Sequence, residues 1–288
     1  MPFCQKTTKP WDSIGAARQY FGRQNDPRIV FASRTDEKIK DVSPDARKVI
    51  GDAFGGKTAA ASDPILRPLL TLLGCCKSDE RESTKERQEV AAFCFGFFMI
   101  ELLEKGGMIL AINGPDGEMK SCIVFHEYQT EKEKARPTGV WKKIFGFIRD
   151  VKAYIIMKGD KLGLPKALGD KDKKKILDES DKMFAPFGDL ICKKHVKSGP
   201  QEPHWYIGIV ASDPESQGQG YCKEIMTLLC CAADENGRQC YLECLTKNRT
   251  FYEKFGFQAT ESFSIDIELR GSKMTLSCVG MTRPCLGA

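Results

Sequence analysis

The stretch that decides the fold is His204-Trp-Tyr-Ile-Gly-Ile-Val-Ala-Ser212, followed directly by Asp213-Pro-Glu-Ser-Gln-Gly-Gln-Gly-Tyr-Cys222. Its first part is an apolar run bounded by polar residues, which predicts a buried strand. Its second part places two glycines just before an amphipathic segment, which predicts a helix over 220–236. Free N–H groups and the helix dipole favour phosphate at a helix start, and glycine lets a ligand approach the backbone closely. The stretch therefore predicts an anion-binding loop between a strand and a helix.

Taken alone, this loop has more than one interpretation. It lacks the Lys-Ser/Thr pair of a nucleoside-triphosphate P-loop, and it is not a G-x-G-x-x-G dinucleotide fingerprint. A glycine pair before a helix is also compatible with a plain tight turn. The sequence on either side of the loop is needed to distinguish a binding loop from a turn.

Strands and helices alternate around this stretch. Downstream we expect a strand over 239–245, a short helix over 248–255 and strands over about 258–268 and 273–282. Upstream we expect a strand over 28–33, a helix from Ser43 as N-cap to about 54, a short helix over 66–73, a charged loop over 75–85, a helix over 86–105, and a hairpin of 108–113 with 119–128. Crossovers mixed with hairpins predict one mixed α/β sheet with helices on both faces.

The order of motifs resembles the GNAT superfamily of N-acetyltransferases. The motifs are a strand, Gln217-x-x-Gly220-x-Cys222, a helix, a strand, and Asn248-x-x-x-Tyr252-x-x-Phe255-Gly256-Phe257. Residues 204–220 and Tyr241-Leu-Glu243 look most similar to the puromycin N-acetyltransferase-like branch, and residues 204–257 carry the strong similarity. The resemblance implies a GNAT-type α/β fold: a mixed, mostly antiparallel sheet with helices on both faces and a splayed central strand pair.

The resemblance also implies acetyl-CoA as co-substrate and no metal. Amides of the glycine loop would hold the pyrophosphate, while the end of the preceding strand would pair with pantetheine as an added strand does. Asn248 would face the cofactor arm. The cofactor-binding residues implied are Val210, Ala211, Ser212, Gln217, Gly218, Gln219, Gly220, Tyr221, Cys222 and Asn248.

Two residues are candidates for catalysis. Tyr252 lies four residues after Asn248 and hence on the same helical face, and in the family such a tyrosine protonates the departing CoA thiolate. Its alternative is packing in the core beside two phenylalanines. Glu243 is the best candidate base for the amine, directly or through water, and its alternative is a structural salt bridge or hydrogen bond. His204 is interpreted as a surface or core histidine.

Cys222 stands where the family usually has glycine or alanine. In the first turn of a helix, the dipole and free N–H groups predict a thiolate with a lowered pKa that bound CoA protects from alkylation. The alternative is an inert thiol in the packing interface of the helix.

Composition restricts the cellular compartment of the protein and the kinds of site it can contain. The most apolar run, 91–100, is ten residues long and too short to cross a membrane. The N-terminus lacks the charged and apolar regions of a signal peptide. Thirteen cysteines, an odd number with two adjacent pairs, indicate reduced thiols. No C-x-x-C occurs and histidines number three, which argues against a metal site. We expect a cytoplasmic protein.

Basic residues concentrate in 131–200, which contains 18 Lys/Arg and 10 Asp/Glu. We interpret this segment as a helical insertion. Trp141, Ile144, Ile148 and Ile155 predict one apolar helix face, which suits either core packing or a membrane surface. The lysines of 171–175 are interleaved with acids, which indicates a solvated face, so no nucleic-acid partner is expected.

These observations predict an N-terminal extension over 1–27 and one acetyltransferase domain over 28–284, with the insertion at about 131–200. The expected reaction is direct transfer of acetyl from acetyl-CoA to a primary amine, a small-molecule acceptor, in a ternary complex. A protein-lysine acetyltransferase and a non-catalytic CoA-binding module are the alternatives. The sequence does not indicate an oligomeric state.

Overall fold

The computed structural model describes residues 13–33, 35–57, 64, 80–128, 190–191, 193–195, 197–269 and 272–286. Its helices are α1 (Ser13–Gly22), α2 (Ile39–Gly55), α4 (Glu80–Glu104), α8 (Tyr221–Glu235) and α9 (Arg249–Glu253), with 3-10 turns η1 (Pro214–Ser216) and η2 (Thr246–Asn248). Its strands are β1 (Ile29–Ser33), β2 (Met108–Asn113), β3 (Met119–Tyr128), β4 (His204–Ser212), β5 (Gln239–Leu245), β6 (Gln258–Leu269) and β7 (Ser272–Arg283).

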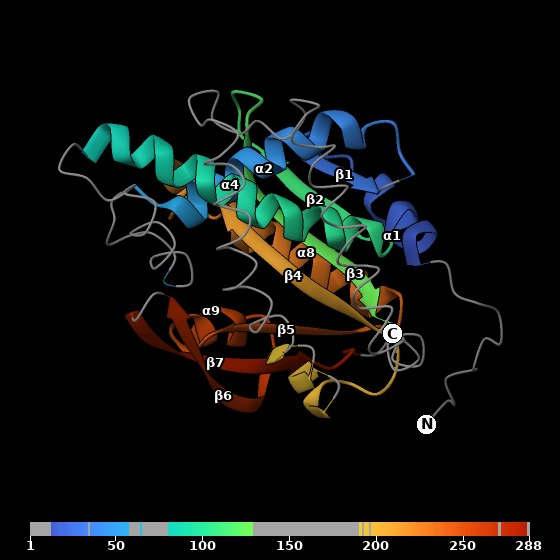
Figure 1. Cartoon of the computed structure of the whole chain (residues 1–288). Helices are drawn as coiled ribbons and strands as arrows, with labels where there is room; N and C mark the ends of the chain where they lie inside the picture. Colours follow the sequence, from blue (N-terminus) through green and yellow to red (C-terminus); the bar gives the residue numbers. More distant parts are fainter. Residues whose placement is uncertain are drawn as a thin grey trace.

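The strands form one seven-stranded sheet in the order β1-β2-β3-β4-β5-β7-β6 (Figure 1). Every neighbouring pair is antiparallel except β4 and β5, which are parallel. These two central strands pair only from His204 with Gln239 to Tyr206 with Tyr241, and the described residues beyond that point do not pair. The predicted fold class, a mixed and mostly antiparallel sheet with a splayed central pair, is confirmed.

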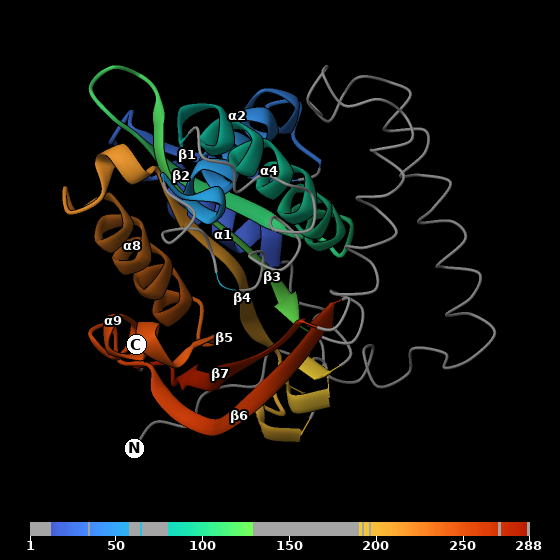
Figure 2. The same ribbon diagram turned by 60° about the vertical axis from the view of Figure 1, so that its left-hand side comes forward.

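Helices cover both faces of this sheet, with α8 on one side and α2 and α4 on the other (Figure 2). Successive side chains of β3 point to opposite faces of the sheet and so contribute to both core layers. Ile123 and Phe125 pack toward α8, while Cys122 and Val124 pack toward α2 and α4. We call these layers the α8-side core and the α2/α4-side core. None of the described helices is both long and apolar enough to cross a membrane.

A β-bulge interrupts β4 at Gly208. Val124 of β3 pairs with Ile209, but the next residue, Phe125, pairs with Ile207, so Gly208 is the extra residue. Ile207 therefore packs in the α8-side core and Ile209 in the α2/α4-side core. A Cβ at Gly208 would lie 2.5 Å from Cδ1 of Leu102, so a larger residue here would displace this side chain of α4. The bulge bends β4 just where it leaves β5.

Two helix starts differ from the prediction. Helix α2 begins at Ile39, and Pro44 lies inside it rather than at its first position. Pro44 and Lys40, whose carbonyl loses its helical partner, are both exposed, so water can replace the missing hydrogen bond. Helix α4 begins at Glu80, which makes part of the predicted charged loop helical. The helix predicted over 66–73 and the amphipathic helix of 141–155 lie outside the described residues.

Candidate active site

The glycine loop between β4 and α8 presents its backbone to open space. Asp213 fixes its start, because its carboxylate accepts hydrogen bonds from Glu215 N and from Ser216 Oγ, both at 2.9 Å. Gly218 and Gly220 have φ angles of +82° and +91°, which favour glycine. A Cβ at either position would meet no atom within 4 Å. The loop therefore has room for a ligand against the amides at the start of α8.

The end of β4 lies between this loop and the opening of the sheet. Val210, Ala211 and Ser212 pair with β3 on one side, and on the other side β5 has already diverged. Ser121 of β3 donates a hydrogen bond of 2.7 Å to Ala211 O, and its Oγ lies 2.9 Å from that of Ser212. In an antiparallel strand, alternate backbone groups point away from the partner. Backbone groups of this stretch are thus available to an added extended chain.

The structure corrects the prediction that the pKa of the Cys222 thiol is lowered. Burial raises the pKa of its thiol, and the hydroxyls of Ser212 and Ser121 lower it by less. The side chain is half-buried and packs against the α8-side core. The expected lowering of the pKa is therefore wrong, because desolvation of the thiolate outweighs the helix dipole at this position. Its small size, rather than its reactivity, suits the first turn of α8.

Glu243 of β5 carries the most perturbed carboxyl of the opening. Burial raises its pKa to about 8, while the hydroxyls of Tyr206 and Tyr241 act in the opposite direction. These hydroxyls face the carboxylate, and both carboxylate oxygens are buried. Gly280, opposite Glu243 on β7, leaves room for Tyr241, whose Oη lies 2.6 Å from where a Cβ would be.

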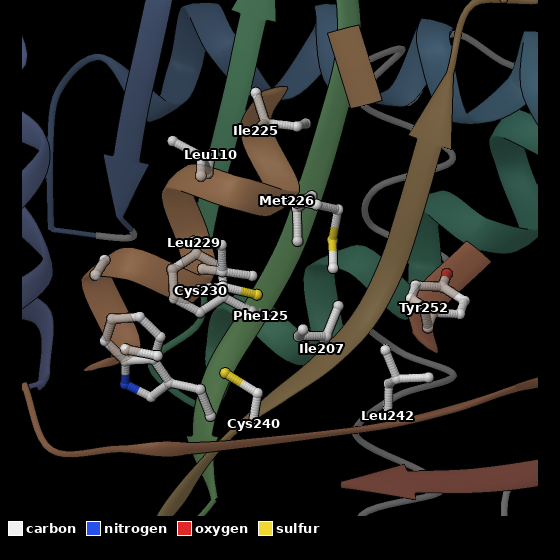
Figure 3. Packing of buried hydrophobic residues seen from close by; sticks show 14 of the residues in the cluster. Leu110, Phe125, Ile207, Ile225, Met226, Leu229, Cys230, Cys240, Leu242 and Tyr252 are labelled. Carbon is white, nitrogen blue, oxygen red and sulfur yellow. The ribbon is translucent and has the colours of Figure 1, made fainter. Parts of the chain in front are cut away.

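Tyr252 of α9 lies on the other side of the opening. Its ring packs in the α8-side core, edge-to-face with Phe251 at 5.1 Å and with Phe257 at 6.0 Å between ring centroids. Burial raises the pKa of its hydroxyl, which is close enough to Cys244 and Cys222 for electrostatic interaction. Figure 3 shows Tyr252 with Ile207 and Met226, which belong to the same core cluster. Tyr252 is thus a core residue on the α8 side of the opening.

The structure brings some predicted residues together and separates others. Glu243 lies beside Tyr206 and Tyr241 of the α2/α4-side core, whereas Tyr252 belongs to the α8-side core, so the two candidates flank the opening from opposite faces. Asn248 is exposed and ends the 3-10 turn η2 before α9 begins. Asn248 is the N-cap of α9 and has αR dihedrals, so the expectation that it shares a helical face with Tyr252 stays a prediction.

Residues 190–198 bring a histidine that the sequence argument missed. His195 is buried beside Tyr206 and Tyr241, and its Nε2 lies 2.7 Å from Nε2 of His204. His204 is fully buried, as expected for a core histidine. No local pattern marks His195, because its partners come from three strands. Its burial is unusual for a ring in a lysine-rich segment.

The same segment is tied to β6. Lys194 Nζ lies 2.5 Å from Oε1 of Glu261, and Ser198 donates a hydrogen bond to the same carboxylate. Leu190 and Ile191 pack on a third cluster, formed by α4, β6 and β7 and including Phe263. The described end of the expected insertion therefore covers the α2/α4 side of the opening. The described residues contain no group of three or more His, Cys, Asp or Glu placed to hold a metal ion.

Comparison with known families agrees with this geometry. Residues 186–259, from before β4 into β6, match a family model described as an acetyltransferase (GNAT) domain. The chain therefore carries a GNAT acetyltransferase domain and is an acyltransferase of the acetyl-CoA-dependent N-acetyltransferase class. No curated protein matches the chain.

Solved structures give distant likenesses. A "histone acetyltransferase HPA2 and related acetyltransferase" from Corynebacterium glutamicum is 16% identical with a TM-score of 0.43, covering 90% of this chain and 97% of that one. The ribosomal-protein-S18-alanine N-acetyltransferase from Escherichia coli is 9% identical with a TM-score of 0.43, covering 90% and 96%. Arylalkylamine N-acetyltransferase 2 from Aedes aegypti is 12% identical with a TM-score of 0.40, covering 87% and 97%. Likenesses this distant carry no argument about the acceptor.

Proposed function

We propose that this protein transfers acetyl from acetyl-CoA directly to a primary amine, with a small molecule as the acceptor. The observation that carries the proposal is the opening between β4 and β5, which has the glycine loop at its end, Glu243 on one face and Tyr252 on the other. The likeness of 204–220 to the puromycin-type branch favours a small amine over a protein lysine.

The residues at this opening fit acetyl-CoA, which supplies the acyl thioester when bound. The exposed loop of Gln217, Gly218, Gln219 and Gly220 offers amides for a pyrophosphate, and the open space at both glycines is the room that a phosphate needs. The edge of β4 from Val210 to Ser212 suits the amides of pantetheine. Tyr221, Cys222 and exposed Asn248 border the same region in this proposal.

Glu243 acts as the base in this mechanism. A primary amine is protonated at neutral pH and has to lose a proton before it attacks a thioester. The ionised Glu243 carboxylate, buried among tyrosines, accepts that proton. Its pKa of about 8 is close to physiological pH, which suits a base that has to both take up and release a proton. Tyr252, protonated at neutral pH, donates its phenolic proton to the departing thiolate.

A screen of amines with acetyl-CoA and detection of free thiol tests the proposed function. We expect thiol release with one class of small primary amine and the matching N-acetyl product. Turnover confined to lysine peptides favours the protein-acetylating alternative. Tight binding of acetyl-CoA without turnover on any amine or peptide favours a binding module.

Glu243→Gln is expected to remove the acid limb of the pH profile, near pH 8, and to stabilise the fold. The sign follows from the pKa: the folded value of about 8 lies above the ordinary 4.5. Ionisation is therefore unfavourable in the folded state, and the free energy of unfolding decreases as the pH rises from about 4.5 to about 8. Thermal unfolding at pH 5 and pH 9 checks this. The variant should gain stability over the parent at pH 9 and much less at pH 5. An equal difference at both values contradicts the buried ionisation.

The boundaries of the domain, about 28–284 with the insertion at 131–200, are also a proposal. The described end of the insertion covers the side of the opening where Glu243 lies, so we propose that the insertion helps to select the amine. Replacement of 139–185 by a short linker should change the ratio of kcat/KM values between amines by about tenfold or more, with little change in acetyl-CoA affinity. Assays on an amine panel and calorimetry with acetyl-CoA measure the two effects. An unchanged acceptor profile contradicts the proposal.

A further inference from the structure

A buried cluster of aromatic rings lies beside Glu243, and the mechanism above does not use it. Its members come from three strands and from the segment before β4: His126 and Tyr128 (β3), His204 and Tyr206 (β4), Tyr241 (β5), and His195. His195 has 4% of its surface exposed, although three nearby lysines give its segment a strongly polar character. Burial of this ring in a basic segment calls for a reason.

The His195 ring covers both tyrosines that face Glu243. Its centroid lies 4.9 Å from that of Tyr206 and 4.4 Å from that of Tyr241, with interplanar angles of 24° and 21°. The Tyr128 ring lies 4.0 Å from the same ring between centroids and is tilted by 31°. Stacking at these distances fixes the planes of the two tyrosines. The positions of their hydroxyls against Glu243 thus depend on His195.

Hydrogen bonding fixes the orientation of His195 in turn. His204 Nδ1 lies 2.8 Å from the carbonyl oxygen of Glu202, which can only accept, so Nδ1 carries the proton. A neutral His204 then presents a lone pair at Nε2, and His195 Nε2, at 2.7 Å, is the donor. This assignment leaves one consistent pair of tautomers. His195 is therefore held by contacts with three tyrosine rings and by a hydrogen bond to His204.

Both imidazoles are neutral in these surroundings. Burial lowers the pKa of His204 to about 4, and burial together with His204, His126 and Lys105 lowers that of His195 further. A cationic imidazole next to Glu243 would favour the carboxylate and repel a protonated amine. The neutral pair packs against the tyrosines that face Glu243 without supplying that charge.

We propose that His195 is a positioning residue for Glu243: its ring, held by His204 and stacked on Tyr206 and Tyr241, keeps water from the carboxyl. This inference rests on the role proposed for Glu243 as the base. Removal of the ring would open a space lined by His204 and by tyrosines, two of which face the Glu243 carboxyl, and a polar space of that size admits water. Water would stabilise the carboxylate.

Other groups that face this region act on the same equilibrium. Glu261 of β6 interacts with Tyr241 but is itself paired with Lys194, and Lys105 at the end of α4 acts on His195. Among the described residues, the titratable and charged groups that interact with Glu243 are Tyr206, Tyr241 and Cys244. Those that interact with Tyr241, with His195 or with Glu261 are Tyr128, His126, His204, Glu261, Lys194 and Lys105. A variant at His195 leaves all of the other groups in place.

The test compares His195→Ala with His195→Phe. The alanine variant removes the ring, whereas phenylalanine keeps a stacked ring of similar size and loses the hydrogen bond to His204. Proteins labelled with 13C at the glutamate carboxyl are titrated by NMR, and the signal absent in Glu243→Gln identifies Glu243. We expect its midpoint to fall by about one pH unit or more in the alanine variant and to stay within about 0.3 unit in the phenylalanine variant. The acid limb of kcat/KM should move with the NMR midpoint.

Each other outcome has a defined meaning. An unchanged Glu243 midpoint in folded His195→Ala, or an equal shift with phenylalanine, overturns the role of His195. A shifted NMR midpoint with an unmoved kinetic limb leaves that role intact and overturns Glu243 as the base. If the alanine variant does not fold, His195→Asn makes the same comparison, because its shorter side chain also leaves space for water.

Discussion

Gly220→Val is expected to abolish acetyl-CoA binding while the fold persists. Gly220 caps α8, its φ is +91°, and a Cβ there would project into open space next to the first amides of the helix. That space is where the proposed pyrophosphate site lies, so a branched side chain excludes the anion from the amides. We expect affinity to fall by roughly 100-fold or more, because the whole charge-assisted contact is lost. Calorimetry with acetyl-CoA measures the loss.

A valine at a positive φ strains the backbone at any position in the protein. The experiment therefore needs a control that separates backbone strain from obstruction of the anion site. Gly237, at the opposite end of α8, supplies the control: its φ is +63° and a Cβ there also meets no atom within 4 Å. Gly237→Val carries a similar backbone cost, about 1–2 kcal/mol, without touching the loop. Equal loss of affinity in both variants, or undiminished affinity in folded Gly220→Val, would remove the pyrophosphate site from this loop.

The elements nearest the opening were predictable because their signals are local. The β2–β3 hairpin, β4, β5 and α8 lie where their apolar runs and bounding glycines indicate, as at Gly237 and Gly256. Helix α2 was not, because Ser43-Pro44 has the pattern of a helix start while tertiary packing extends the helix back to Ile39. A solvent-facing proline costs the helix little there.

The chemistry of the opening was less predictable than its position. Cys222 has its pKa raised because burial, a property of the packed protein, outweighs a dipole that the sequence suggests. The His195 cluster joins β3, β4, β5 and a segment outside the sheet, so no spacing in the sequence marks it. Both cases depend on which residues meet across long sequence separations, and a single sequence does not carry that information.

Tyr252→Phe is expected to lower kcat by roughly 10- to 1000-fold with acetyl-CoA affinity nearly unchanged. The substitution removes one oxygen and keeps the ring contacts with Phe251 and Phe257. No hydrogen bond from the Tyr252 hydroxyl is found among the described residues, so phenylalanine leaves no protein partner there unpaired. A loss of kcat therefore reports on the proton of Tyr252 rather than on the fold.

The raised pKa of Tyr252 bears on this expectation in two ways. Burial keeps the phenol protonated at neutral pH, as a proton donor has to be. Burial also makes it a weaker acid, and desolvation likewise makes a thiolate formed beside it a stronger base. Steady-state kinetics at saturating amine, with calorimetry for acetyl-CoA, separate kcat from binding. Phe251→Leu is the matched control for lost packing, since it alters the same aromatic contact and leaves the hydroxyl in place. If Tyr252→Phe keeps the parent kcat, Tyr252 is a packing residue and another group protonates the thiolate.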